Sequence, residues 1–318
     1  MTWMPFLCLA IGFFIGMRNL TERMLKKIDG IINIALVVLM LTIGINIGIN
    51  DSVMSNLDSI GLNCLAISLS AIAFSVLFTV IIEKTALPLD KLKEKLSSEN
   101  ININSEIDIS KEGKSENSRL IWIMPVSIVI GVILGYFLTS YIQTFLLDYM
   151  LIGSLIILYV SVGISLSSNK KVFKYIKILG FRVIYISIAV IAGSLVGGFV
   201  SGTLLGIPLH ISVMSASGMS YYSLTGAYMT QVYGIQAGTY GFVVNVMREF
   251  FTVLLLPFLI KISMGSPIAS GAAGNMDTML VPVTKVVGAE LGLVTLITGV
   301  ILTFVVPFIL PVLYSLFS

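Results

Sequence analysis

Four polar side chains interrupt the apolar stretch YGFVVNVMREFFTVLLLPFLI (240–260) at helical spacing. Asn245, Arg248, Glu249 and Thr252 are therefore predicted to line one side of a helix. An ionised side chain at the centre of a bilayer costs at least a few kcal/mol, so such residues face protein or water and mark ion or substrate routes. Glu249 is the strongest candidate for that role. Arg248 as its structural partner is the alternative, although adjacent helix positions diverge by about 100°.

A second acid, Asp277, lies in SPIASGAAGNMDTMLVPV (266–283), which is rich in small residues and carries a proline near each end. That composition is typical of a re-entrant loop or a discontinuous helix, in which a carboxylate can reach a watered cavity. Asn275 and Thr278 flank the acid and join it as candidate binding residues. The alternative for Asp277 is a helix N-cap at a cytoplasmic surface turn.

Hydroxyl groups and glycines cluster in SASGMSYYSLTGAYMTQVYG (215–234), where they predict a break between two half-helices. The N-terminus of a half-helix can hold a carboxylate through its free backbone N–H groups and its dipole. The alternative is that the tyrosines belong to an interfacial aromatic belt. The candidate binding residues of this break are Ser217, Gly218, Tyr221, Tyr222 and Ser223.

The elements that must position these residues are transmembrane helices. Of the 318 residues 57% are hydrophobic and 11% charged, and the mean hydropathy of +1.01 excludes a soluble fold. The apolar runs approach the roughly 20 residues that a spanning helix needs, without the alternation of an outer-membrane strand. We predict an all-α polytopic membrane protein with about eight spans, at 3–17, 31–49, 60–82, 120–138, 149–166, 182–205, 239–260 and 290–316. Two less regular stretches, 208–234 and 266–287, are predicted to be re-entrant or discontinuous hairpins, with full crossings as the alternative.

Lys and Arg residues alternate between the connections of these helices. The connections 17–30, 83–119 and 167–182 carry four, seven and five of them, whereas 50–59 and 139–148 carry none. By the positive-inside rule, the three basic connections face the cytoplasm. The amino terminus and, with two hairpins, the carboxyl terminus are then predicted to lie outside.

The glycines predict an internal duplication. A shift of 119 residues maps Gly12, Gly16, Gly44 and Gly61 onto other glycines, whereas 28 glycines in 318 residues give about half a coincidence by chance. Each unit holds three helices, an odd number, so the copies are inverted, as in many secondary transporters. The alternative is two glycine-rich helix pairs that pack through small residues. The predicted organisation is a first repeat (1–84), a disordered cytoplasmic linker (85–118), a second repeat (119–206) and a core with two hairpins and two helices (207–318).

Other residues carry weaker signals. Asn46 and Ser165 occupy equivalent repeat positions and are second-tier candidates with Thr252, although helix-packing hydrogen bonds are an alternative role. Cys8 and Cys64 each lie inside an apolar span, so neither a disulfide framework nor a zinc site is predicted. The Lys and Arg residues are accounted for by the orientation of the helices in the membrane, so nucleic acid is not a predicted partner. The sequence is compatible with a homo-oligomer.

The segments GINIGIND (44–51), ASGMSYYSLTG (216–226), NVMREFFTVLLLPFLI (245–260) and GAAGNMDTMLVPV (271–283) resemble the LysO family of bacterial lysine exporters. With the order of the helices, the resemblance covers essentially the whole chain. It implies export of L-lysine and close analogues across the inner membrane, with Glu249 and Asp277 as the intramembrane acids. In the family pattern a proline follows the aspartate slightly sooner than Pro282 does here, so the second hairpin departs from the pattern at this point.

An export mechanism for lysine needs coupling. Moving a unit positive charge outward against an inside-negative potential costs roughly 2.3 kcal/mol per 100 mV. A buried carboxylate can hold either a proton or an ammonium group, and competition for it gives a simple antiporter. We expect Glu249 and Asp277 to bind the amino groups or exchange a proton for them, and the 217–223 break with Asn275 to hold the substrate carboxylate. The proton is then the coupling ion and no other cofactor is predicted.

Two alternatives to lysine export remain at this stage. One is an exporter of another cationic amine or a drug, which the sequence does not distinguish. The other is an intramembrane hydrolase that uses Glu249 and Asp277 as an acid pair. The sequence holds no nucleophile-and-base constellation or metal cluster that favours an enzyme.

Overall fold

The computed structural model describes residues 4–18, 22–98, 126–137, 144–168 and 179–318. Among these residues, six helical segments are long and apolar enough to cross a membrane: Gly30–Ile49, Leu57–Thr85, Phe145–Ser165, Phe181–Leu205, Ile235–Ile262 and Ala289–Phe317. Two shorter apolar helices, Met4–Met17 and Val126–Phe137, accompany them. A helix therefore lies within each of the eight predicted spans, and the prediction of an all-α polytopic membrane protein is confirmed.

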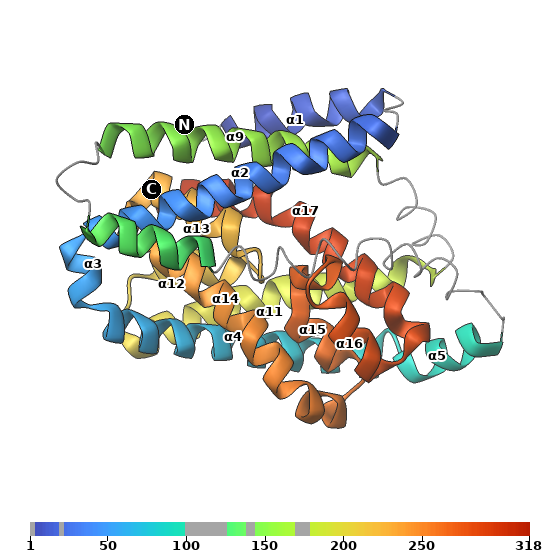
Figure 1. Cartoon of the computed structure of the whole chain (residues 1–318). Coiled ribbons are helices and arrows are strands. Elements are labelled where there is room, and N and C mark those ends of the chain that lie inside the picture. The colour runs from blue at the N-terminus through green and yellow to red at the C-terminus, as the bar shows by residue number, and fades with distance from the viewer. Residues whose placement is uncertain (1–3, 19–21, 99–125, 138–143, 169–178) are drawn as a thin grey trace.

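The long helices form two groups with the irregular segments between them (Figure 1). One group contains α1 (Met4–Met17), α2 (Glu22–Ile49) and α9 (Thr144–Ser168), and the other pairs α4 (Leu57–Thr85) with α11 (Ile184–Leu205). Two more long helices, α14 (Ile235–Ile262) and α17 (Gly292–Phe317), complete the core. A short helix, α3 (Asp51–Ser55), joins α2 to α4, and its N-cap Asn50 accepts a hydrogen bond from the Val53 amide.

Glycines allow helices of the two predicted repeats to touch at backbone distance. A methyl group added to Gly131 would lie 2.9 Å from Cα of Gly44, and one added to Gly163 would lie 3.0 Å from Cα of Gly12. Under the shift of 119 residues, Gly12 corresponds to Gly131 and Gly44 corresponds to Gly163. Gly44 therefore contacts the equivalent of Gly12, and Gly12 contacts the equivalent of Gly44. Exchanged contacts of this kind are what a two-fold axis between two copies of a unit produces.

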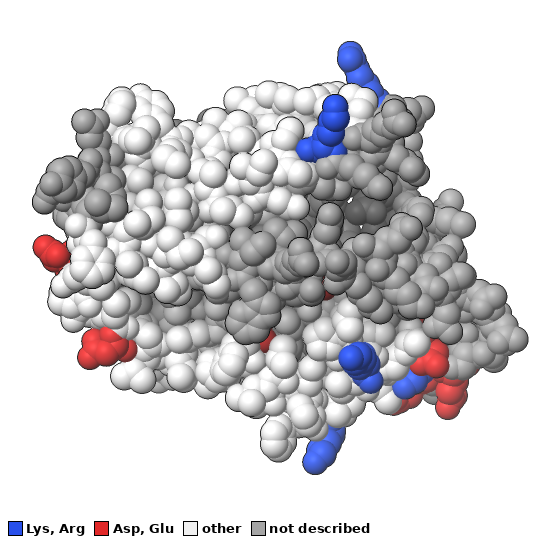
Figure 2. All heavy atoms as spheres, viewed as in Figure 1, with Lys and Arg blue, Asp and Glu red and all other residues white. Residues whose placement is uncertain are grey.

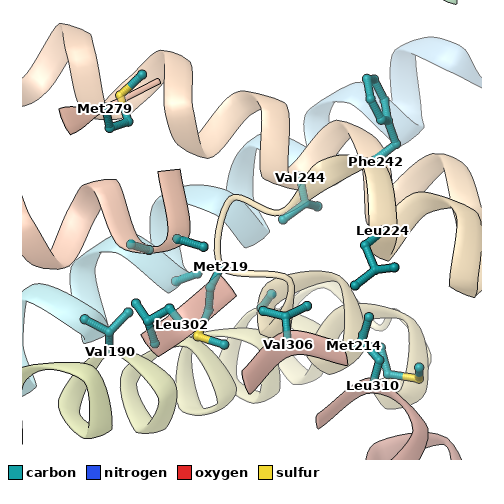
Figure 3. Packing of buried hydrophobic residues seen from close by; sticks show 14 of the residues in the cluster. Val190, Met214, Met219, Leu224, Phe242, Val244, Met279, Leu302, Val306 and Leu310 are labelled. Carbon is teal, nitrogen blue, oxygen red and sulfur yellow. The ribbon is translucent and has the colours of Figure 1, made fainter. Parts of the chain in front are cut away.

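The segment between α11 and α14 folds back on itself. It contains α12 (Leu209–Ser217) and α13 (Tyr222–Tyr233), and the His210 ring near its start lies 4.7 Å from the Tyr233 ring at its end. Between the two helices, Met219 and Ser220 have positive φ angles of 48° and 75°, which non-glycine residues rarely adopt. Figure 3 shows Met219 on this irregular stretch among buried apolar side chains. We call 209–233 the first hairpin.

A second hairpin (265–287) enters from the opposite end of the molecule. It contains α15 (Gly265–Gly271), the 3₁₀ turn η2 (Ala272–Met276) and α16 (Leu280–Val287). Its start and its end are both attached to the stretch 83–93, because the Gly265 amide donates to Glu83 and Lys93 donates to the Val287 carbonyl at 2.9 Å. The tips of the two hairpins meet where the Ala273 amide donates to the Met219 carbonyl at 2.9 Å. Both segments are therefore hairpins, as the prediction favoured, and neither runs from end to end.

One part of the predicted linker is helical. Residues 89–98 of the stretch 85–118 form α5 (Leu89–Ser98), so the prediction of disorder is wrong there. Leu87 and Leu89 are buried against the core. These two apolar contacts attach the short helix to the protein although most of its residues are polar or charged. Residues 99–118 lie outside the described part of the chain.

Charge is distributed unevenly along the molecule. On the face seen in Figure 2, every blue Lys or Arg lies in the half that contains α5, while the end that contains α3 shows only acidic groups. By the positive-inside rule the α5 end faces the cytoplasm, in agreement with the alternation of basic connections in the sequence. The second hairpin therefore opens toward the cytoplasm and the first toward the outside.

Candidate functional site

Two carboxylates meet beneath the tip of the second hairpin. The Thr278 hydroxyl donates to Oε1 of Glu249 at 2.9 Å, and the Thr278 backbone amide donates to Oδ1 of Asp277. Glu249 is half-buried, and the charge of Asp277 acts on it. The Asp277 side chain is accessible to solvent although it lies among the core helices. We call Glu249 and Asp277 the acid pair, and Thr278 is hydrogen-bonded to both carboxylates.

A glycine makes this approach possible. A methyl group added to Gly274 would lie 2.9 Å from Oε1 of Glu249 and 3.2 Å from the Thr278 hydroxyl. A side chain at this position would displace the carboxylate or the threonine that bonds to it. The small residues AAGNM before Asp277 therefore let the tip of the second hairpin reach α14.

The first hairpin brings two phenols to the acid pair. Tyr221 lies within electrostatic range of the Asp277 carboxylate, and Tyr222 lies within range of both acids. Both tyrosines are partly exposed, and the Tyr222 ring packs against Phe242 with ring centroids 5.6 Å apart. They lie where α13 begins, so the free amides of its first turn face the same region.

Other predicted residues of the first hairpin are buried within it. Ser217 and Ser223 are buried, and the Ser217 hydroxyl donates to the Met214 carbonyl at 2.8 Å. A methyl group on Gly218 would overlap the side chains of Asn245 and Thr225. These three positions therefore shape the break, and the acid pair is approached by the tyrosines that follow them.

Asn245 and Asn275 hold the two hairpin tips. The Asn245 amide group accepts from the Ser220 backbone N–H at 2.8 Å and donates to the Ser215 carbonyl at 2.9 Å. Asn275 is fully buried and donates to the Ile268 carbonyl at 2.7 Å, whereas its Oδ1 has no hydrogen-bond partner among the described residues. This oxygen lies next to Gly271, where an added methyl group would be 2.1 Å from it, and in the described part of the chain no contact joins Asn275 to the acid pair.

Arg248 lies on a different side of α14 from the acid pair. It is 1% exposed and donates four hydrogen bonds, all to uncharged oxygens. The acceptors are the Ser75 and Ser194 hydroxyls and the Ala269 and Ser270 carbonyls, at 2.8–3.2 Å. Arg248 is therefore satisfied by neutral groups and is no counter-ion of Glu249.

Thr252 extends the same buried side by one helical turn. Its hydroxyl donates to the Arg248 carbonyl and bonds with the Ser270 hydroxyl, each at 2.7 Å. It therefore helps to attach the second hairpin to α14 and does not reach the acid pair.

Sequence reasoning missed the two serines that bind Arg248. Ser75 lies on α4 and Ser194 on α11, 3.2 Å apart, and their separation in the chain is 119 residues, the same as the shift between the predicted repeats. The shift of 119 residues maps Ser75 onto Ser194, so the sequence did indicate that the two serines are equivalent. Only glycines were compared at that shift, and the serine pair was therefore overlooked.

The second-tier residues lie on helices of the outer group. Asn46 on α2 donates to the Thr42 carbonyl of its own helix at 3.1 Å, and Ser165 on α9 is half-buried. Both helices contact α13, so the two residues border the core without joining the acid pair. Among the described residues no group of three or more His, Cys, Asp or Glu side chains is arranged to hold a metal ion.

The family profile described as lysine exporter LysO matches residues 6–95 and 126–314, which include both hairpins and the acid pair. The chain belongs to this family. It is 26% identical over 304 residues, 95% of each chain, to the protein named lysine exporter LysO of Escherichia coli K12. It is also 25% identical to a putative lysine exporter of Haemophilus influenzae, over 58% of this chain and 93% of that protein. No solved structure matches. As a member of the LysO family with several spanning helices, the chain is a multi-pass protein of the inner membrane.

Proposed function

We propose that this protein exports L-lysine and close analogues from the cytoplasm in exchange for protons. The observation that carries the proposal is the acid pair, two carboxylates that Thr278 holds together between hairpins entering from opposite ends of the molecule. The names of the two relatives supply the substrate, because both are lysine exporters by name.

The chemistry of lysine matches the groups around the acid pair. Lysine carries two ammonium groups and one carboxylate, and two carboxylates offer acceptors for the ammonium groups. The first turn of α13 lies on the hairpin that brings Tyr221 and Tyr222 toward the acid pair. We assign the substrate carboxylate to the break around Tyr221 and Tyr222, where backbone amides and phenol hydroxyls are donors.

Coupling follows from competition at the acid pair. A carboxylate that has bound a proton no longer attracts an ammonium group, so proton and lysine occupy Glu249 and Asp277 in turn. Export of a cation against 100 mV costs roughly 2.3 kcal/mol, and protons that enter down their gradient supply this free energy. Sites that exchange cations in this way do no covalent chemistry, and we assign no enzymatic activity to the chain.

The exchanged glycine contacts support alternating access, in which the acid pair is open first to one side of the membrane and then to the other. We infer that 1–84 and 119–206 are inverted repeats, because the 119-residue shift relates the contact between Gly44 and Gly131 to the contact between Gly12 and Gly163, and Ser75 contacts its own equivalent, Ser194. In transporters built from inverted repeats, the two halves exchange conformations between the inward-facing and outward-facing states.

Transport by the purified protein in proteoliposomes tests the proposal. Vesicles loaded with L-lysine and placed under an imposed pH gradient should release lysine unaltered, and Glu249→Gln should abolish the pH dependence. Asp58→Asn, which removes an exposed acid from the first turn of α4, is the matched control and should leave transport unchanged. Undiminished pH-dependent export by Glu249→Gln would refute the assigned role. Preference for another cationic amine in competition assays would instead correct the substrate.

A further inference from the structure

A row of aromatic residues leads from the acid pair to the outer end of the molecule. Tyr221 is the N-cap of α13 at the tip of the first hairpin, and Tyr228 follows seven residues later, two helical turns along α13. Tyr159 of α9 is buried in the same core as Tyr228, and α9 contacts α13. The Tyr228 ring then lies 6.5 Å from the Tyr314 ring, between centroids, and Tyr314 lies 5.4 Å from Tyr233. We call these five residues the tyrosine row.

The outer end of the row is the open end of the first hairpin. Tyr233 ends α13 and stacks with His210 at 4.7 Å, and Tyr314 lies in the last turns of α17. This end is remote from the Lys- and Arg-bearing end seen in Figure 2. The row therefore spans the outer half of the molecule and runs where α13 faces α9 and α17.

The hydroxyl groups of the row are not explained by packing. Tyr159 is fully buried and Tyr228 is 2% exposed, yet neither hydroxyl has a hydrogen-bond partner among the described residues. The Tyr233 hydroxyl is in the same condition. A buried donor without a partner destabilises a protein, and phenylalanine would fill the same space without that penalty. Three such hydroxyls in one row therefore suggest a role that needs the oxygen atom.

We propose that the tyrosine row conducts the coupling proton between the outer surface and the acid pair, a proposal that rests on the function proposed above. A phenol hydroxyl both donates and accepts, so it can take a proton from water on one side and release its own on the other. Each tyrosine ends as it began, and the net change is one proton moved from the outer surface to a carboxylate of Glu249 or Asp277. Water molecules connect successive hydroxyls in this scheme.

Tyr159→Phe and Tyr228→Phe test the proposal, because each substitution removes only the oxygen atom. Lysine transport driven by a pH gradient should fall at least about tenfold. Exchange of labelled lysine against unlabelled lysine at equal pH should stay within about twofold, since that exchange moves no net proton. The apparent Tm in detergent should stay the same or rise, because a buried hydroxyl without a partner has been removed. Tyr149→Phe, at an exposed tyrosine of the same helix as Tyr159, is the matched control.

The outcomes separate the two proposals. Unchanged pH-driven transport in both variants would overturn the tyrosine row. An equal loss of pH-driven transport and of lysine exchange would also overturn it, because the row would then act on the substrate or on the fold. If the unsubstituted protein exchanges lysine but shows no response to a pH gradient, proton coupling itself is wrong and the inference falls with it.

Discussion

Two consecutive residues of α14 carry opposite charges and have opposite surroundings. Arg248 is sealed, with four hydrogen bonds to hydroxyls and carbonyls from three elements. Glu249 is half-buried, bonds to the hydroxyl of Thr278 and lies within the electrostatic influence of a second acid. The difference arises because neighbouring helix positions point about 100° apart. A charge inside a membrane protein therefore marks a transport site only when the surrounding protein leaves it available.

The sealed side of α14 has a mechanical role. Arg248 connects Ser75 of α4 and Ser194 of α11 to the carbonyls of Ala269 and Ser270 at the end of α15. The guanidinium group suits this task, since its donors are fixed in a planar fork that reaches several acceptors at once. Arg248 thus positions the second hairpin, whose tip carries Asp277 and Thr278, and the open side depends on the sealed side for its geometry.

Replacement of Arg248 should have the largest effect on stability. In Arg248→Met the carbonyls of Ala269 and Ser270 lose their donor, at about 1–3 kcal/mol for each buried acceptor. Arg248→Lys keeps the charge but offers donors from a single nitrogen, so it should recover only part of the loss. The measurement is the apparent Tm in detergent together with the yield of monodisperse protein.

The matched control for Arg248 is its neighbour. Glu249→Gln should leave the apparent Tm nearly unchanged, because the amide keeps an acceptor for Thr278. Full stability in Arg248→Lys would show that charge alone matters at this position. A large loss of stability in Glu249→Gln would show that Glu249, like Arg248, has a structural role, and would contradict the different roles given to the two sides of α14.

Much of the fold and of the acid pair could be predicted from the sequence. Long apolar runs are sufficient to identify spanning helices, because lipid requires every backbone polar group to be satisfied within the segment. The rarity of acids in such segments singled out Glu249 and Asp277, and in the structure Thr278 is hydrogen-bonded to both. The hairpins were indicated by small residues and prolines, which disfavour a continuous helix.

Other features were beyond sequence reasoning for physical reasons. Serines occur along most of these helices, and helical spacing does not reveal which hydroxyl meets a guanidinium group from another helix, as Ser75 and Ser194 do. The helical part of the linker, α5, depends on Leu87 and Leu89 finding an apolar surface on the core. The grouping of Arg248 with Glu249 rested on their spacing, whereas their separation depends on contacts with other elements.

A smaller effect is expected on the open side of α14. Thr278→Val removes the hydroxyl that bonds to Glu249 and keeps the shape of the side chain. A hydrogen bond to a charged group contributes about 1.5–3 kcal/mol, so we expect roughly a tenfold loss of lysine transport rate. Thr298→Val is the control, since this buried hydroxyl on α17 has no partner among the described residues. Equal transport by both variants would contradict the role given to Thr278.

The smallest expected effect tests the two-fold relation on the sealed side. Ser75→Ala and Ser194→Ala each remove one neutral acceptor from Arg248, which keeps its other three. Each should therefore lower the free energy of unfolding by about 1.5 kcal/mol, the lower end for a hydrogen bond to a charged group. Their effects should be alike, because the two serines occupy equivalent positions in the proposed repeats and contact each other at 3.2 Å. Ser187→Ala, which removes a buried hydroxyl without a partner from α11, should cost nothing. The double variant should deviate from additivity, because both serines share one arginine. Strongly unequal single effects would mean that Arg248 belongs to one half of the protein and does not lie on a symmetry axis.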